Sequence, residues 1–286
     1  MRVTAILAKY LLQLKADGRS PYSIDQARRH VELLDRWLVE HRRSRDVRRI
    51  GHEDLAAFLA GPEATLRRDG KPKQQTSNNA LRSSIRMFFL YSHTAGFATR
   101  NAAALVRRAR CAPPPPRAMP PDDVQQLLAT VDAAEGWAAT RDSALLHVLV
   151  ESGARIGSVL ATTVEDLDLR HGELTLRHTK GNRPHVLSLP RGLCRRLRAY
   201  LSDRTSGPLF ATPNGRPLGG RQARRRMTMW LATAGCRPAS PHALRHSYAM
   251  ALYGRSRDIA AVQRALGHQS IASTMIYARS PALAPR

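Results

Sequence analysis

Apolar residues in the first hundred positions recur every three or four residues, the spacing that places them on one face of an α-helix. This pattern predicts helices at residues 3–15, 21–38, 52–59, 76–93 and, briefly, 101–107. Ser20 is expected to cap the second helix and Pro21 to fill its first position, where a missing amide proton costs nothing. Because no alternating strand pattern occurs here, we expect an all-helical domain over residues 1–110.

A run of four prolines separates this region from the rest of the chain, within residues 111–117. Proline lacks an amide donor and cannot continue a helix, so consecutive prolines form a stiff, extended spacer. We therefore expect a linker at 111–117 and a second domain over 118–286.

The second domain mixes helical and strand-like periods. A helix is predicted to begin at Pro121, and a strongly apolar one at 141–151 is expected to end at Gly153. Later helices are predicted at 193–203, 221–234, from about 241, at 258–266 and at 270–279.

Two short segments with alternating polarity, 174–178 and 185–189, flank a Gly-Asn pair and predict a β-hairpin. The fold class expected from all these patterns is therefore mainly α with a small antiparallel β-sheet. The second domain is expected to be mixed α/β.

The helix beginning near Pro241 carries two chemically active residues. His242 and Arg245 are three apart and share one face, which is expected to point to a surface or cleft. The opposite, core-facing stripe is expected to consist of Leu244, Tyr248 and Ala251.

The end of the chain places further polar residues near this helix. Gly267 is expected to end the helix at 258–266 and to present His268 on a turn. In the last segment, the helical spacing buries Ile271, Met275 and Ala278 and leaves Ser270, Ser273, Thr274 and Tyr277 on the polar side. A tyrosine in that position is not placed as a core residue.

Basic residues outnumber acidic ones by 46 to 22, which gives a net charge of +24. The excess is shared, since residues 1–110 and residues 111–286 each carry +12. Basic surfaces on both domains suit a clamp around a polyanion. A codon bias toward arginine would explain arginine over lysine, but not basic over acidic residues. We therefore expect a nucleic-acid partner.

The same composition argues against a membrane or secreted protein. No apolar run long enough to cross a bilayer, no signal peptide and no lipidation motif is present. The cysteines are odd in number and lack CxxC spacing, which indicates a reduced cytoplasmic protein without structural zinc: Cys111, Cys194 and Cys236.

The pattern H-x-x-R, then L-G-H, then a tyrosine nine residues later resembles the C-terminal signature of the tyrosine recombinases, or phage integrase family. Ser152-Gly-Ala-Arg-Ile156 resembles the segment with the family's first arginine, and His178-Thr-Lys-Gly-Asn182 the hairpin with its lysine. The resemblance covers about residues 118–280 and gives six site residues: Arg155, Lys180, His242, Arg245, His268 and Tyr277.

These side chains suit phosphoryl transfer on chemical grounds alone. Two guanidiniums can hold the phosphate oxygens that become more negative in the transition state, and a phenol can act as the nucleophile. Metal-dependent nucleases need carboxylates, whereas Asp122-Asp123 and Glu165-Asp166-Asp168 look like helix-start and turn residues. We expect neither a metal nor another cofactor.

Lys180 is one of only five lysines in an arginine-rich chain. Lysine can release a proton when its surroundings lower its pKa, whereas arginine does not. The residue is therefore the candidate acid for the leaving oxygen. Singly, each of the six residues also has an ordinary structural interpretation, for example a helix cap at His242 or an ion pair between Arg245 and Asp258.

The resemblance implies a site-specific recombinase that cuts and rejoins DNA through a covalent 3′-phosphotyrosine on Tyr277, without metal or ATP. It implies a helical core-binding domain with a SAM-like fold at 1–110 and a catalytic domain at 118–286. Arg155 and Arg245 would bind the non-bridging oxygens, His242 and His268 would bind the phosphate or assist proton transfer, and Lys180 would protonate the leaving group.

The implied assembly is a homotetramer on double-stranded DNA, with a possible accessory DNA-bending protein or partner recombinase. The implied location is cytoplasmic and nucleoid-associated. Two prolines among the nine residues after Tyr277 disfavour a docking helix, so we expect a monomer in free solution. The chain looks closest to two-domain recombinases of the Xer or transposon-encoded sort.

Two features leave alternatives open. Gly157 and Ser158 follow Arg155 and Ile156, where relatives often carry an acidic residue. The same chemistry would also serve a type IB topoisomerase-like enzyme, and the same fold could belong to a catalytically silent DNA-binding protein.

Overall fold

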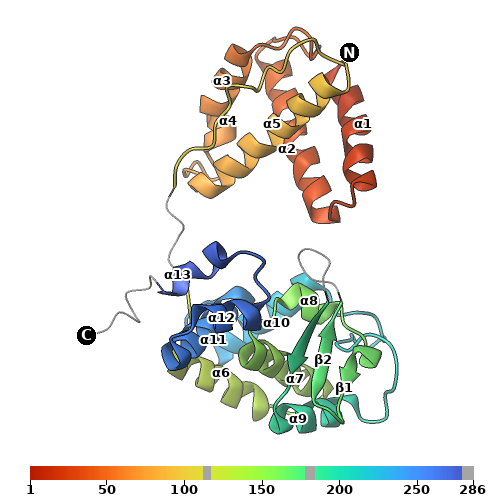
Figure 1. Ribbon diagram of the computed structural model, residues 1–286, viewed down its shortest axis with the longest axis vertical. Coiled ribbons are helices and arrows are strands. Elements are labelled where there is room, and N and C mark those ends of the chain that lie inside the picture. The colour runs from red at the N-terminus through yellow and green to blue at the C-terminus, as the bar shows by residue number, and fades with distance from the viewer. Residues whose placement is uncertain (112–116, 178–183, 279–286) are drawn as a thin grey trace, which may run out of the picture. The chain divides into compact units, whose positions relative to one another are not determined.

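The computed structural model describes residues 1–111, 117–177 and 184–278 of the chain. The chain divides into two compact units, Met1–Ala112 and Pro113–Arg286 (Figure 1). The four prolines of the expected linker fall within residues 112–116, outside the described residues. No helix in the described parts of the chain is long and apolar enough to cross a membrane.

The N-terminal unit is helical, and its apolar faces meet in one core. Its elements are α1 (Val3–Ala16), α2 (Pro21–Glu40), α3 (His52–Ala60), α4 (Pro62–Thr65) and α5 (Gln75–Thr94). The Ser20 hydroxyl accepts a hydrogen bond from the Ser23 amide at 3.2 Å, so Ser20 caps α2 as predicted. Phe58, Phe88 and Ile85 are among the fully buried side chains of this core.

The predicted helix at 101–107 is wrong: this stretch forms turns. The Asn101 side chain accepts a hydrogen bond from the Ala103 amide at 3.0 Å, and the backbone bonds that follow, from Ala104 to Asn101 and from Val106 to Ala103, span three residues as in turns. Further along, the amide and carbonyl of Ala109 bond the Asn79 side chain, each at 2.9 Å. The local pattern could not reveal this pairing, because its partner lies 30 residues away.

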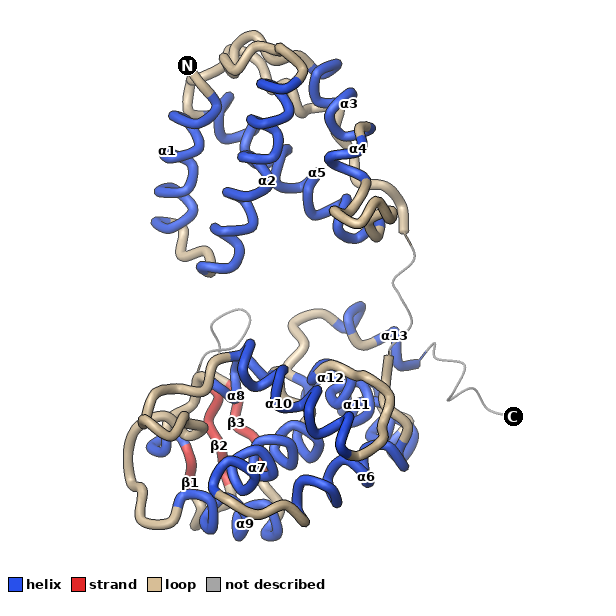
Figure 2. Tube along the Cα trace, turned by 180° about the vertical axis from the view of Figure 1, so that it is seen from behind, coloured by secondary structure: helices blue, strands red, loops and turns tan. Residues whose placement is uncertain are grey.

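The C-terminal unit is mainly helical with one small sheet, which gives the fold class predicted from the sequence (Figure 2). Its helices are α6 (Pro121–Asp132), α7 (Trp137–Ser152), α8 (Ile156–Leu160), α9 (Arg191–Leu201), α10 (Gly220–Thr233), α11 (Pro241–Ser256), α12 (Ile259–Leu266) and α13 (Met275–Ala278), with short 3-10 turns at Val164–Asp166 and Ile271–Ser273. The sheet contains β1 (Leu167–Asp168), β2 (Glu173–Leu176) and β3 (His185–Ser188) in the order β1-β2-β3, all antiparallel.

The β2–β3 pair is the predicted hairpin, with Thr175 opposite Val186 and Leu176 opposite His185. Its tip, residues 178–183, lies outside the described residues. Leu174 and Leu187, also opposite one another, are buried in the core, so one face of the hairpin packs against the helices.

Helix α7 runs through the middle of this unit and packs against α6, α9 and α11. It buries even charged residues: Arg141 and Asp142 are each 2% exposed and form an ion pair at 2.7 Å. The Trp230 indole also donates to Asp142, at 2.8 Å, so the buried carboxylate has several partners. The helix ends at Gly153, whose φ of 61° is the left-handed conformation expected of that position.

Met119, near the start of the C-terminal unit, is attached to α11. The Met119 amide donates to the Ser247 hydroxyl at 2.8 Å, and Ser247 Oγ lies 3.0 Å from the Met119 carbonyl oxygen, to which it can donate. Met119 is itself buried in the core. The start of the C-terminal unit is thus fixed to the middle of a helix more than a hundred residues later.

Two sequence predictions for the C-terminal segments are corrected. In α11, Leu244 is buried as expected, but Tyr248 is half-buried and Ala251 is exposed, so the core-facing stripe does not continue along the whole helix. In the last segment, Ile271 is 47% exposed, whereas Thr274 and Tyr277 are buried. A 3-10 turn precedes the short α13, so the segment does not follow one regular helical period.

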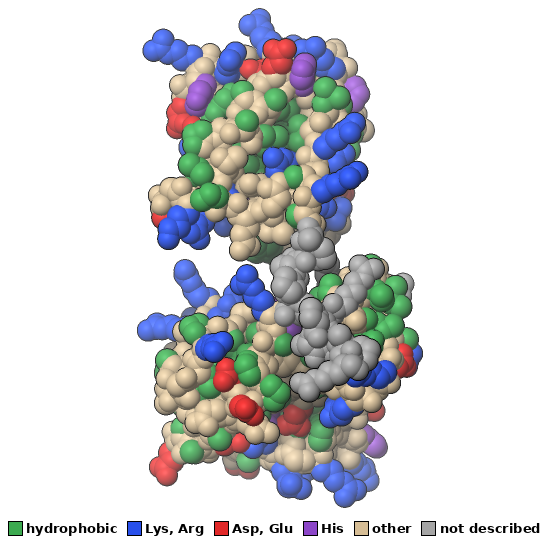
Figure 3. Space-filling view, turned by 90° about the vertical axis from the view of Figure 1, so that its left-hand side faces the viewer, with side chains coloured by type: hydrophobic (Ala, Val, Ile, Leu, Met, Phe, Trp, Pro, Cys, Tyr) green, Lys and Arg blue, Asp and Glu red, His purple; other side chains and the backbone are tan. Residues whose placement is uncertain are grey.

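Lys and Arg side chains stand out from the visible face of both units (Figure 3). The chain has 46 basic and only 22 acidic side chains, so its carboxylates cannot pair one to one with all of the basic groups. Each unit therefore offers a positively charged surface.

Candidate active site

Arg245, on the first turns of α11, is the most enclosed charged residue of the site and is only 2% exposed. Its two terminal nitrogens donate to the carbonyl oxygens of Gly153 and Leu266, each at 2.8 Å. Both carbonyls lie at helix C-termini, where the helix dipole is negative and stabilises a cation. The alternative interpretation of Arg245, an ion pair with Asp258, is not seen within the described residues; Asp258 instead lies 3.5 Å from Arg264.

Gly153 allows this arrangement because it has no side chain. A Cβ at this position would lie 2.4 Å from the Tyr248 ring of α11, too close for any real contact. The left-handed φ of Gly153 disfavours other residues as well. The glycine thus lets the end of α7 approach α11 and places its carbonyl against Arg245.

Arg155 follows immediately, at the N-cap position of α8, and is half-buried. Within the described residues no group accepts a hydrogen bond from its guanidinium, so the donors are available to a ligand. Burial, opposed by the nearby Tyr277 phenol, lowers the pKa of Arg155 below its usual value.

Two cavities meet at these two arginines. One, of about 210 Å³, is lined by Arg155, Arg245 and His268 together with residues of β3 and the end of α12. The other, of about 250 Å³, is lined by Arg155, Arg245 and His242. Neither is lined by a carboxylate among the described residues, so both present a positive surface to an anion.

Tyr277 is buried on α13, with its hydroxyl 3.0 Å from Nδ1 of His246 on α11. Its burial raises the pKa of the phenol, while the charges of Arg245 and Arg155 act in the opposite direction. The structure therefore places the phenol near both guanidiniums, which stabilise its ionised form.

The histidines form a row beside the arginines. The His242 and His246 rings meet edge to face, with centroids 4.6 Å apart. His268 follows Gly267 on the turn after α12, as predicted, and its Nδ1 lies 2.9 Å from the Thr274 hydroxyl oxygen.

Desolvation and the positive neighbours keep these imidazoles neutral near pH 7. Burial, with the charges of Arg245 and Arg155, lowers the pKa of His268 to about 4. Burial also lowers the pKa of His246 to about 4, with help from His242 and Arg245. The pKa of His242 is lowered in the same way, although part of its surface stays exposed.

The structure brings together five of the six residues named from the sequence: Arg155, His242, Arg245, His268 and Tyr277. Lys180 lies outside the described residues. The structure adds His246 and Thr274, which hold Tyr277 and His268. His246 had a signal in the sequence, since it directly follows Arg245, but only the fold of α13 reveals its partner.

The acidic clusters have structural roles, as expected. Asp122 and Asp123 lie in the first turn of α6. Asp166 accepts a hydrogen bond from the Thr163 amide at 3.0 Å and another from the Arg177 guanidinium. Asp168 caps the turn that follows β1.

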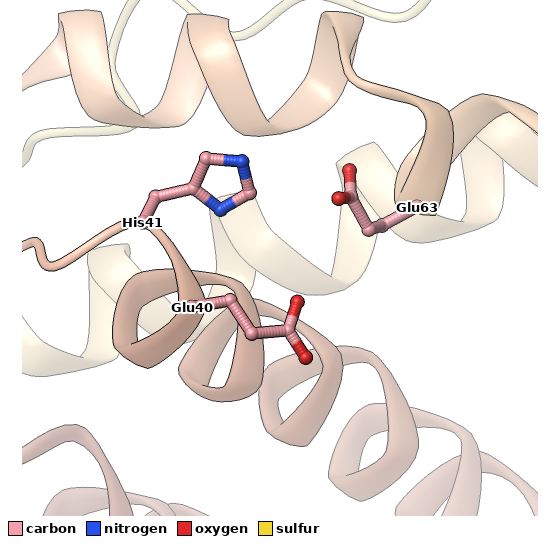
Figure 4. A group of neighbouring side chains, drawn as sticks. All are labelled: Glu40, His41 and Glu63. Carbon is pink, nitrogen blue, oxygen red and sulfur yellow. The ribbon is translucent and has the colours of Figure 1, made fainter.

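One group in the described chain has ligand spacing for a metal: Glu40, His41 and Glu63, with candidate ligand atoms within 4.8 Å of one another (Figure 4). Nδ1 of His41 is hydrogen-bonded to the Trp37 carbonyl at 3.0 Å, and the two rings stack. Glu40 and His41 are exposed. The group belongs to the helical unit and shares no residue with the cluster around Arg245, and we assign it no function.

Comparison with known proteins shows the family to which the chain belongs. A model described as "Phage integrase family" matches residues 117–282. The chain is 29% identical to tyrosine recombinase XerC of Chromobacterium violaceum, over 95% of this chain and 88% of that protein. It is 32% identical to XerC of Azotobacter vinelandii, over 85% of this chain and 90% of that protein.

The fold is also similar to solved structures. It matches a lambda integrase (75–356) dimer bound to a COC′ core site with a TM-score of 0.71 and 19% identity, covering 96% of this chain and 97% of that one. It matches XerH recombinase bound to its difH substrate with a TM-score of 0.73 and 19% identity, covering 95% and 80%.

Proposed function

Since this chain belongs to the phage integrase family and is a tyrosine-type site-specific recombinase, we propose that it breaks and rejoins double-stranded DNA with Tyr277 as the nucleophile. The single observation that carries the residue assignment is the meeting of two cavities at Arg155 and Arg245, with the Tyr277 phenol in the field of both charges.

In this proposal the scissile phosphate lies against Arg155 and Arg245. The Arg245 guanidinium is held in place by hydrogen bonds to two carbonyl oxygens, whereas the Arg155 guanidinium keeps its donors for a ligand. Preorganised donors of this kind stabilise the charge that develops on the non-bridging oxygens. Because the described lining holds no carboxylate, a magnesium ion would lack its preferred ligands there.

His268 lines one of the two cavities and His242 lines the other, each together with both arginines. Being neutral near pH 7, each can donate one hydrogen bond to a phosphate oxygen without adding charge. Lys180 is proposed as the acid that protonates the 5′-oxygen. Its hairpin starts from β2 and β3, and His185 at the base of β3 lines the cavity beside Arg155.

We propose that the helical unit, residues 1–110, is the core-binding domain and that residues 118–286 are the catalytic domain. The proline stretch 111–117 would be the linker that lets both contact DNA. The shared positive charge supports this division, because phosphate contacts dominate the affinity of DNA-binding proteins.

Assembly on DNA is proposed by analogy. The related lambda integrase has been solved as a dimer on a core site and as a tetramer bound to a Holliday junction. We propose a homotetramer on DNA and a monomer in free solution, acting in the nucleoid, with room for an accessory protein. Nothing in the comparisons favours a topoisomerase or a silent DNA-binding protein.

The decisive experiment is genome-wide mapping of covalent protein–DNA adducts. Cells expressing the wild-type chain should yield adducts on a 3′-phosphate at a defined sequence, and cells expressing Tyr277→Phe should yield none. Adducts that persist in the variant, or that occur without sequence preference, would contradict the assignment. The mapped sequence also supplies the substrate for the experiments below.

A further inference from the structure

The nucleophile of the proposed reaction must lose a proton, and the structure places one candidate acceptor against it. His246 Nδ1 lies 3.0 Å from the Tyr277 hydroxyl, and the two ring centroids lie 5.7 Å apart. We propose that the Tyr277 O–H donates to His246 Nδ1 and that His246 takes this proton as the phenol attacks phosphorus. This inference rests on the proposed role of Tyr277 as nucleophile.

The other histidines of the site are less well placed for this step. His268 uses its Nδ1 to bond Thr274 at 2.9 Å. The His242 ring contacts the His246 ring and lines the cavity of about 250 Å³. Within the described residues it has no hydrogen bond to Tyr277. Among the described side chains, His246 is the one hydrogen-bonded to the phenol.

The surroundings of His246 favour a neutral imidazole before the reaction. Its neighbours on α11 are His242 and Arg245, and its neighbour on α13 is Tyr277. His268, which follows α12, is close enough to interact with it electrostatically. Arg245 is the fixed positive charge among them. A neutral imidazole is the form that can accept a proton, so the resting protonation state is the correct one.

The same surroundings determine the timing of the transfer. The burial that lowers the pKa of His246 to about 4 and raises that of Tyr277 makes a separate imidazolium–phenolate pair unfavourable. As the phenol oxygen bonds to phosphorus its proton becomes acidic, and the phosphate gains negative charge that stabilises an imidazolium. Proton transfer is therefore concerted with attack.

Each bond that forms in this step is matched by a bond that breaks. The Tyr277 O–H bond breaks and its proton moves to Nδ1, while the phenol oxygen forms a bond to phosphorus. The bond from phosphorus to the 5′-oxygen breaks, and that oxygen takes its electron pair and a proton from a separate acid. In the rejoining step the imidazolium returns its proton to the leaving phenol oxygen.

Two separate proton paths follow from this arrangement, one at Tyr277 and one at the 5′-oxygen. A substrate with a 5′-bridging sulfur has a leaving group that needs no proton. It should therefore rescue a defect in the acid, but it should not rescue a defect in His246.

The test is single-turnover cleavage of a nicked substrate by His246→Ala, with and without added imidazole. We expect DNA binding to be kept and cleavage to fall by about 10²-fold or more, the usual share of a general base. Imidazole should restore part of the rate, more so for more basic ring derivatives. His171→Ala is the matched control, since His171 lies on an exposed turn with Asp168 as its partner, and imidazole should not affect its rate.

Cleavage by His246→Ala within about threefold of the wild type would overturn the proposal. If that variant fails to bind DNA, His246→Asn decides, because asparagine keeps a polar atom near the Nδ1 position but cannot hold the proton. A full rate in His246→Asn would mean that the residue only positions Tyr277, whereas a large loss with imidazole rescue supports proton transfer. Cleavage that survives Tyr277→Phe would refute the proposed function itself, which is a distinguishable result.

Discussion

The imidazole of His268 and the hydroxyl of Thr274 are hydrogen-bonded, with Nδ1 and Oγ1 2.9 Å apart. Thr274 is completely buried and lies three residues before Tyr277. The turn is further held by Gln263, whose side-chain amide donates to the His268 carbonyl at 3.0 Å. This polar contact therefore joins the end of α12 to the segment that carries Tyr277.

Thr274→Val should separate these two elements with little change in side-chain volume. Loss of the hydroxyl leaves the nitrogen of the partly buried His268 imidazole without its partner, which costs about 1 kcal/mol of unfolding free energy. Cleavage should slow because His268 and Tyr277 lose their alignment. Thr228→Val is a control: that exposed hydroxyl on α10 bonds the Arg224 carbonyl at 3.0 Å and should matter to neither property. Equal effects of the two variants would contradict the alignment role.

Tyr277→Phe should abolish the covalent adduct and leave DNA binding unchanged. The ring packs as before, and only the hydroxyl and its bond to His246 are lost, so stability should change by about 1 kcal/mol. A gel assay with a nicked substrate measures the adduct, and a mobility shift measures binding. An adduct attached to a 5′-phosphate in the wild-type protein would refute the predicted polarity.

Lys180→Arg should reduce cleavage of an ordinary phosphodiester severely although the charge is kept, because arginine does not release its proton. A 5′-bridging sulfur should restore most of the rate. Absence of rescue would mean that Lys180 only binds phosphate or serves the hairpin. The comparison with His246→Ala, which the sulfur should not rescue, separates the two proton paths in one assay.

Acid should destabilise the C-terminal unit before it protonates most carboxylates. The pKa values of His246 and His268 are lowered to about 4 in the folded protein, whereas an unfolded histidine titrates near 6.5. Between these values the unfolded chain binds more protons, so stability rises with pH over that window and is lost as pH falls through it. Urea unfolding at several pH values measures the slope.

His268→Gln should flatten this slope, because glutamine does not titrate. His171 provides an opposite control: its hydrogen bond with Asp168 raises its pKa in the folded state, so its contribution is present at low pH and is lost as pH rises. His171→Asn should therefore not flatten the slope. A wild-type stability that is level between about pH 4 and 6.5 would contradict the predicted neutral state of the site histidines.

Arg245→Lys should impair both stability and cleavage. Lysine keeps a charge, but its single ammonium cannot reach the Gly153 and Leu266 carbonyls in the planar geometry of a guanidinium. Losing one of these buried bonds costs about 1–3 kcal/mol. Thermal unfolding and DNA cleavage should both fall. Arg255→Lys, on the exposed end of the same helix, serves as the control and should change neither.

Much of this arrangement was predictable from local sequence. Glycine is the residue favoured in the left-handed conformation that ends a helix, and Gly153 and Gly267 take that conformation after α7 and α12. Serine followed by proline favours a helix start, and Ser20 and Pro21 begin α2. The β2–β3 hairpin also follows its alternating pattern. These features depend on neighbours within a few residues, which the sequence displays directly.

The burial of the site was not predictable in the same way. Helical periodicity placed Arg245 and Tyr277 on polar faces, yet both are buried, because carbonyls and side chains from distant segments satisfy them. Such compensation lies 21 to 92 residues away along the chain. Periodicity measures hydrophobicity and cannot detect a polar partner supplied by another element.

The bond between Met119 and Ser247 has a mechanical consequence. Ser247 directly follows His246, so, if residues 111–117 are the linker that we propose, a pull on them would reach α11 one residue from the group hydrogen-bonded to Tyr277. Force is carried best by short, directional contacts, and this attachment consists of hydrogen bonds on a buried residue. The attachment would let a strained linker alter the reactivity of Tyr277 without any contact at the phosphate. Ser247→Ala would uncouple the two, and single-molecule cleavage under applied load would reveal the difference.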